Sequence, residues 1–240
     1  MRYRILGDNL QIVIVELEPG EVVYGEAGTM NHMSGNIQMN TRVIGGFWKG
    51  IKRMLMRESF FMTEFTPVGG RGFVAFNGRA PGKIKALKIE PGREFMVQKD
   101  AFLAAESTVD LDIAFVKKLG AGFFGGEGFI LEKLSGSGTV FIHACGDFIE
   151  YNLAPGQLIK VDTGHIVGFD STVDYDIAYA GSIKTALFGG EGIFLATLRG
   201  PGRVILQSMN VALLASALRP YFPSTSGGGG VKIGPFGLEL

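Results

Sequence analysis

Glycine-centred motifs that recur at a fixed spacing constrain this chain more than any other feature of its sequence. Pro91-Gly92 recurs at Pro155-Gly156, and Phe124-Gly125-Gly126-Glu127-Gly128 recurs at Phe188-Gly189-Gly190-Glu191-Gly192, so both motifs are shifted by 64 residues. Glycine, at 37 of 240 residues, recurs in register instead of forming a low-complexity block. A glycine in register marks a turn or a close backbone approach that every copy needs. The sequence therefore predicts a duplicated unit.

A more diverged copy precedes these two. It begins at Leu17-Glu18-Pro19-Gly20, which matches Ile89-Glu90-Pro91-Gly92. Its Arg57-Glu58-Ser59-Phe60 takes the place of Gly126-Glu127-Gly128-Phe129. We therefore predict one β domain over residues 1–240, with three tandem repeats at about 8–78, 79–145 and 146–208 and a C-terminal helix and tail at 209–240.

Each unit has the pattern of short antiparallel strands. The pattern from Gln11 to Leu17 has a period of two, and Gly or Pro interrupts the chain about every 8 to 12 residues. Pro-Gly suits the centre of a type II turn, where Gly accepts a positive φ. We expect an all-β fold of three β-sandwich layers about a pseudo-three-fold axis, because one unit is too small to bury its own faces. A helix is predicted at Val211 to Leu218, with Asn210 as its cap and Pro220 ending it.

Charge and cysteine content limit the partners and the cellular compartment expected for the protein. Lys plus Arg and Asp plus Glu both number 23, so the chain lacks the basic excess that binds phosphate backbones, and we expect no nucleic-acid partner. The single Cys145 cannot form an intramolecular disulfide. With no apolar signal segment or membrane-spanning stretch, we expect a soluble, cytoplasmic protein. No zinc or nucleotide motif appears, so no cofactor is predicted.

One glutamate recurs in all three units, at Glu58, Glu127 and Glu191. A carboxylate between glycines can accept hydrogen bonds from exposed loop N–H groups, which is a structural role. General acid or base chemistry would need a partner, and no His, Cys or Ser recurs beside it. We therefore predict no catalytic residue, and an enzyme that uses this glutamate is the third interpretation, after a scaffold and a ligand- or metal-binding module.

Paired aspartates suggest a second kind of site. Asp110 with Asp112, and Asp174 with Asp176, place two carboxylates on one face of a strand, because side chains alternate. An axis that gathered both pairs would create an oxygen-rich ring able to hold Ca²⁺ or Mg²⁺. The alternative is a solvated strand face.

Aromatic residues next to Lys or Arg mark the segment that precedes each repeated glutamate. Unit symmetry would gather these segments at one rim, typical of a membrane contact or a subunit interface. Segments that fold back to cap the end of the sheets are the alternative. The binding residues predicted here are Trp48, Phe123, Phe124 and Phe188, together with the repeated Glu58, Glu127 and Glu191.

Several further motifs carry a family resemblance. They are Glu26-Ala27-Gly28-Thr29-Met30 with Met33-Ser34-Gly35, Arg57-Glu58-Ser59, Asp100-Ala101-Phe102-Leu103-Ala104, Val161-Asp162-x-Gly164-His165 and Leu198-Arg199-Gly200-Pro201-Gly202. With them the chain, from about Tyr3 to Phe222, resembles the altered-inheritance-of-mitochondria, or mitochondrial biogenesis, family of uncharacterised proteins. The resemblance implies three repeats similar to the fold of the tryptophan-RNA-binding attenuator protein, a short double-stranded β-helix variant, and association into a trimer or larger ring. It supplies no enzyme activity.

The function that best fits the sequence is a non-enzymatic, homo-oligomeric scaffold or binding protein, at the periphery of a membrane. Recurring Gly, Pro and apolar positions without a unique polar cluster favour it. A small-ligand or divalent-metal-binding module is the alternative, with the paired aspartates as its test.

Overall fold

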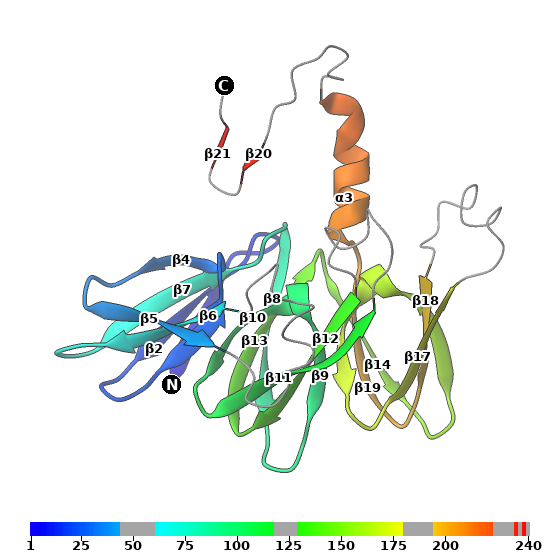
Figure 1. The fold of residues 1–240 in the computed structure, drawn as a ribbon, viewed down its shortest axis with the longest axis horizontal. Coiled ribbons are helices and arrows are strands. Elements are labelled where there is room, and N and C mark those ends of the chain that lie inside the picture. The colour runs from blue at the N-terminus through cyan, green and yellow to red at the C-terminus, as the bar shows by residue number, and fades with distance from the viewer. Residues whose placement is uncertain (44–60, 118–128, 180–193, 223–232, 235–236, 239–240) are drawn as a thin grey trace.

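The described residues fold into four larger β-sheets that follow one another side by side, with one helix projecting beyond them and a two-stranded sheet in the tail (Figure 1). This computed structural model describes residues 1–43, 61–117, 129–179, 194–222, 233–234 and 237–238. The predicted all-β class with a short C-terminal helix is confirmed.

The first set of strands builds sheet A and half of sheet B. Sheet A has the order β1-β2-β7-β4, and β5-β6-β3 form one half of sheet B. The strands are Arg2–Leu6 (β1), Ile12–Leu17 (β2), Val23–Glu26 (β3), Met30–Met33 (β4), Ile37–Val43 (β5), Phe61–Pro67 (β6) and Gly72–Asn77 (β7).

The second set completes sheet B and begins sheet C. It contributes β10-β13-β8 to sheet B and β11-β12-β9 to sheet C. The elements are Gly82–Ile89 (β8), Phe95–Gln98 (β9), the 3-10 turn Lys99–Ala101 (η1), Phe102–Glu106 (β10), Val109–Lys117 (β11), Phe129–Gly136 (β12) and Gly138–Cys145 (β13).

The third set completes sheet C with β16-β19-β14 and forms sheet D, ordered β15-β18-β17. Its elements are Phe148–Leu153 (β14), Leu158–Asp162 (β15), the 3-10 turn Thr163–His165 (η3), Ile166–Asp170 (β16), Asp174–Tyr179 (β17), Phe194–Arg199 (β18) and Gly202–Gln207 (β19).

Within each set, β1 aside, the strands pair in one order. The sixth strand lies between the first and the third, and the fifth lies between the fourth and the second. Two joints connect the sets: β3 pairs with β10, where Gly25 lies opposite Ala104, and β9 pairs with β16, where Val97 lies opposite Gly168. Sheets B and C therefore have six strands each, whereas sheets A and D end the row.

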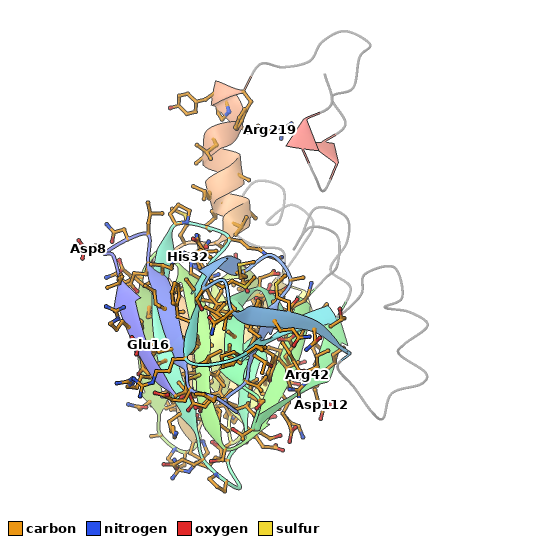
Figure 2. All side chains as sticks on the ribbon, turned by 90° about the vertical axis from the view of Figure 1, so that its left-hand side faces the viewer. Asp8, Glu16, His32, Arg42, Asp112 and Arg219 are labelled. Carbon is orange, nitrogen blue, oxygen red and sulfur yellow. The ribbon has the colours of Figure 1, made fainter. Side chains whose placement is uncertain are left out.

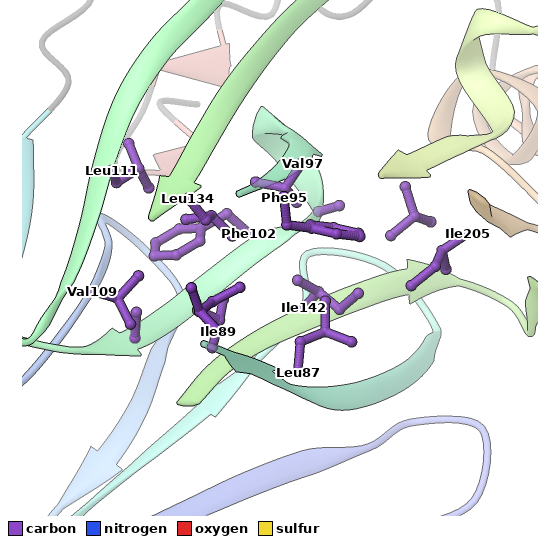
Figure 3. Packing of buried hydrophobic residues seen from close by; sticks show 14 of the residues in the cluster. Leu87, Ile89, Phe95, Val97, Phe102, Val109, Leu111, Leu134, Ile142 and Ile205 are labelled. Carbon is purple, nitrogen blue, oxygen red and sulfur yellow. The ribbon is translucent and has the colours of Figure 1, made fainter. Parts of the chain in front are cut away.

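Apolar cores fill the spaces between successive sheets. The core between sheets B and C contains Phe102 and Ile142 from one sheet and Phe95 and Leu134 from the other (Figure 3). Sheets B and C are covered on both faces, so a central strand such as β13 is buried along nearly its whole length. In the outer sheet A, β2 alternates between buried and half-buried residues, which confirms the predicted period of two.

The Pro-Gly dipeptides that recur at Gly20, Gly92 and Gly156 form the predicted turns. Gly20, Gly92 and Gly156 have φ of 90°, 80° and 78°, the left-handed region that Gly enters without strain. Each turn is closed by a backbone hydrogen bond of 3.0 Å, for example from the N–H of Arg93 to the carbonyl of Glu90. Each joins the first strand of a set to the second.

The helix α3 spans Val211–Leu218, as the sequence predicted, and Asn210 is its N-cap. Pro220 lies in a 3-10 turn, Arg219–Tyr221 (η4), that follows the helix directly. A short hairpin of Ile233–Gly234 (β20) and Gly237–Leu238 (β21) follows in the tail.

Candidate functional site

The repeated glutamates and the aromatic rim predicted from the sequence lie outside the described residues. They fall between the fourth and fifth strands of each set, at 44–60, 118–128 and 180–193. Their roles stay predictions. The residues concerned are Trp48, Glu58, Phe123, Phe124, Glu127, Phe188 and Glu191.

The paired aspartates lie on edge strands of two different sheets. Asp110 and Asp112 are exposed on β11 of sheet C, and Asp174 and Asp176 are exposed on β17 of sheet D. In the part of the chain that the structure describes, no group of three or more His, Cys, Asp or Glu residues could hold a metal ion. The described residues therefore do not gather the two pairs into one site, and a metal bound to either pair stays a prediction.

The structure instead draws attention to Glu132, a carboxyl group buried between sheets B and C. It lies on β12, opposite Val97 of β9 and Ile113 of β11. Alternation puts it on the same face as Leu134, which belongs to the core between sheets B and C. Its side chain is 0% exposed, and among the described residues it alone has buried polar side-chain atoms, both carboxyl oxygens, without a hydrogen-bond partner.

Burial and neighbouring charges act together on this carboxyl. Removal from water raises the pKa of Glu132 well above its usual range, and the charge of Glu26 raises it further. Glu26 lies two residues after Tyr24 on β3, on the face of sheet B that meets sheet C, and pairs with Arg79 at 3.0 Å. From η1, Lys99 lowers the pKa of Glu132 and Asp100 raises it. Glu132 therefore keeps its proton at pH values where an exposed glutamate has lost it.

The other polar groups that bridge sheets B and C have partners. The hydroxyl of Tyr24 donates to the carbonyl oxygen of Val109 at 3.1 Å, and burial raises the pKa of this phenol. The guanidinium of Arg42 lies 4.5 Å from the centre of the Tyr24 ring and 3.3 Å from a carboxylate oxygen of Glu64. A buried polar group with a partner stabilises an interface, whereas one without a partner weakens it. Glu132 is thus the exception in this interface.

Glu132 could have been found in the sequence by comparing equivalent positions of the three sets. Thr63, Glu132 and Ala196 occupy the same place in their sets, opposite Gly25, Val97 and Val161 of the second strand. Of these three residues, Glu132 alone has a carboxyl group. The fold therefore does not require an acid here.

A second candidate site is the base of α3, which a polar network fixes to η3. Nδ1 of His165 lies 2.8 Å from the carbonyl oxygen of Gln207, which can only accept, so Nδ1 carries the proton. Nε2 then accepts from the side-chain amide of Asn210 at 3.3 Å, and the Asn210 oxygen accepts from the N–H of Leu213 at 2.8 Å. A Cβ on Gly164 would lie 2.8 Å from the same amide nitrogen, so glycine leaves room for it.

Beyond this base, α3 contacts little of the described part of the chain. It has no buried residue, and its side chains are almost all apolar. Tyr221 and Phe222, directly after it, are 85% and 67% exposed. Figure 2 shows the helix standing clear of the sheets, with Arg219 at its far end. In the described ranges, no helix is both long enough and apolar enough to cross a membrane.

Successive sheets, two of them shared between neighbouring sets of strands, together with a buried acid and a projecting apolar helix, define a multi-sheet β protein. The chain belongs to the family described as mitochondrial biogenesis AIM24, whose model matches residues 3–209. The resemblance noted in the sequence is thereby confirmed.

Two relatives from Streptococcus pyogenes are similar over most of this chain. The uncharacterized protein M6_Spy0233 of a serotype M6 strain is 29% identical over 223 residues, which are 90% of this chain and 88% of the relative. The crystal structure of protein SPYM3_0169 superposes with a TM-score of 0.75 and 27% identity, over 92% of this chain and 99% of that one. Neither name states an activity.

Proposed function

We propose that this protein is a non-enzymatic, oligomeric scaffold or binding protein that attaches to a lipid surface through α3. The supporting observation is that α3 exposes apolar side chains on several sides, among them Val211, Leu213 and Leu218. A helix that is apolar all round is normally buried. Something outside this chain's described residues therefore covers it.

The length of α3 and the residues that follow it favour a lipid surface as its partner. Its eight residues span about 12 Å, less than half of the roughly 30 Å hydrocarbon core of a bilayer, so it can enter one leaflet but not cross. Arg219 follows it and can pair with lipid phosphate. Tyr221 and Phe222 come next, and aromatic rings favour the boundary between headgroups and chains. The polar network at Asn210 holds the other end on the sheets.

Vesicle binding tests this proposal. The protein is sedimented with vesicles of phosphatidylcholine and phosphatidylglycerol, alongside a variant with Leu213→Ser, Leu218→Ser and Phe222→Ser. We expect the wild type to sediment with the vesicles and the variant to stay in the supernatant. A control variant with Leu10→Ser and Val68→Ser, exposed apolar residues in connections between strands, should bind as the wild type does.

Two outcomes would contradict a lipid role. Wild-type protein that stays in the supernatant rules out attachment to these lipids. If, in addition, the α3 variant has a smaller mass by light scattering than the wild type, α3 is a contact between subunits instead.

A further inference from the structure

The hydrogen bonds at the base of α3 fit one arrangement of protons. The carbonyl oxygen of Gln207 can only accept, so Nδ1 of His165 carries a proton and Nε2 is left as an acceptor. The side-chain amide nitrogen of Asn210 donates to Nε2 at 3.3 Å, while the amide oxygen accepts from the N–H of Leu213 at 2.8 Å. Every group in this network therefore has a matching partner only when His165 is neutral.

A second proton on His165 would place two donors against each other. The Nε2–H of the charged ring would face the NH₂ group of Asn210. Turning the Asn210 amide over would offer its oxygen to His165, but the NH₂ group would then face the N–H of Leu213. The amide has one oxygen, and the charged histidine and the first turn of α3 would both need it. Protonation of His165 and the cap of α3 therefore oppose each other.

The chain directly before α3 is held by other contacts. The side chain of Gln207 donates to the carbonyl oxygen of Gly164 and accepts from the N–H of Cys145, both at 2.8 Å. The N–H of Met209 donates to the carbonyl oxygen of Cys145 at 3.2 Å. The helix itself has no buried residue, and Figure 2 shows it clear of the sheets. Loss of the Asn210 contact would therefore free α3 without detaching the end of β19.

Few titratable side chains lie on the described elements around His165. Histidine ordinarily changes its charge between about pH 5 and pH 8, and this one is half-buried, so solvent reaches it. The residue of β18 opposite Asp162 is the apolar Leu195, and α3 has no titratable side chain. Burial raises the pKa of the Cys145 thiol, and Asp147 pairs with Lys83 at 2.6 Å. Aspartates and thiols ordinarily change charge outside this range. The titratable neighbours are Asp162 of β15, Cys145 of β13 and Asp147 just before β14.

We propose that the contact between His165 and Asn210 is a pH-sensitive latch, which holds α3 when His165 is neutral and releases the helix cap when His165 is protonated. The inference rests on the proposed function, because it gives the latch a role in attachment to a lipid surface. With the latch closed, α3 meets lipid as a formed helix. With the latch open, its first turn has to form again during binding, so attachment becomes weaker.

Hydrogen exchange at the Leu213 amide, measured without lipid, tests the latch directly. The rates are compared with those of the unfolded chain at the same pH, which removes the intrinsic effect of pH on exchange. From about pH 8 to about pH 5 we expect protection in the wild type to fall by about fivefold, the usual size of a lost cap. His165→Gln keeps a side-chain oxygen as acceptor and cannot gain a proton, so its protection should stay constant.

Two further variants separate a latch from a contact that only fills space. His32→Gln removes an exposed histidine on β4 and should show the same fall in protection as the wild type. Asn210→Asp supplies a carboxylate that still caps the N–H of Leu213 and pairs with a protonated His165 better than with a neutral one. Its protection should therefore rise as the pH falls, the reverse of the wild type.

Vesicle sedimentation tests the role of the latch in attachment. Vesicles of phosphatidylcholine and phosphatidylglycerol are mixed with the wild type and with His165→Gln at both pH values. We expect equal binding at the higher pH and, at the lower pH, wild-type binding weaker by about fivefold, because the cap has to form again on the lipid. Comparing the two proteins at one pH cancels the effect of acid on the lipid and on all other charges.

The latch and the proposed function fail in different ways. Equal protection of the wild type and His165→Gln over the pH range, or an Asn210→Asp variant that follows the wild type, would overturn the latch and leave lipid attachment to its own test. Equal vesicle binding of the two proteins at the lower pH would overturn the role of the latch in attachment. A wild type that loses Leu213 protection as expected but never sediments with vesicles would uphold the latch and overturn lipid attachment.

Discussion

Replacing Glu132 by Gln should remove a pH dependence from the stability of the protein. The folded state holds the Glu132 proton because the carboxyl is fully buried without a partner, whereas the unfolded chain releases it near the ordinary glutamate pKa of 4.5. The sign follows from linkage: with a raised folded-state pKa, stability is full below about pH 4.5 and falls as the pH rises toward the folded-state pKa. Gln has nearly the same shape and no proton to lose.

The size of the effect follows from one proton. Between the unfolded and folded pKa values, the wild type loses about 1.4 kcal/mol of unfolding free energy per pH unit relative to the Gln variant. The difference between the two proteins should therefore grow by this amount for each pH unit above 4.5, until the pH reaches the folded-state pKa of Glu132. For a chain of this length each such pH unit is about 3–6 °C in melting temperature.

Urea unfolding and calorimetry over this pH range measure the difference. Glu26, Lys99 and Asp100 are present in both proteins, so the difference between the curves isolates Glu132. Glu90→Gln is the control, because its side chain is exposed, and it should run parallel to the wild type. Parallel curves for Glu132→Gln would refute the reasoning, since they would mean that Glu132 has the same pKa in the folded and unfolded chain.

Two further substitutions test the joint and the helix base. Gly168→Ala would place a Cβ 2.4 Å from the carbonyl oxygen of Met96, so it should lower the unfolding free energy by about 1–3 kcal/mol. The control is Gly35→Ala, which has open space around it and should change the unfolding free energy by less than about 0.5 kcal/mol. Equal melting temperatures for the two would contradict the close packing. Asn210→Ala removes the cap of α3 and should lower the stability of the helix by about 1 kcal/mol. The measurement is hydrogen exchange at the Leu213 amide, which should become faster. Unchanged exchange would show that the cap contributes nothing.

Local features of the fold were predictable from the sequence. The Pro-Gly turns and the cap at Asn210 depend on residues that are neighbours in the chain, and the structure has both where the sequence predicted them. The alternation of β2 was equally clear, because an outer sheet has one face covered.

Features that depend on the neighbouring sheet were not predictable in this way. The burial of β13 on both faces comes from sheets on either side, which no local pattern of that strand contains. Glu132 belongs to no recurring motif, because the other two sets have Thr63 and Ala196 at its position. A search for repeated motifs therefore does not select it. His165 stands in the sequence only as the end of the motif that begins at Val161, which says nothing of its partner Asn210 at the base of α3, 45 residues further along the chain.

Consecutive sets of strands share sheets B and C, and this sharing affects how the molecule unfolds. In arrays whose repeats only touch, one repeat can open while its neighbours stay folded. Here each joint is a pair of hydrogen-bonded strands within one sheet, so opening the second set would strip main-chain partners from β3 of the first set and from β16 of the third. The middle of the molecule therefore has no independent melting transition, and its stability belongs to the whole chain.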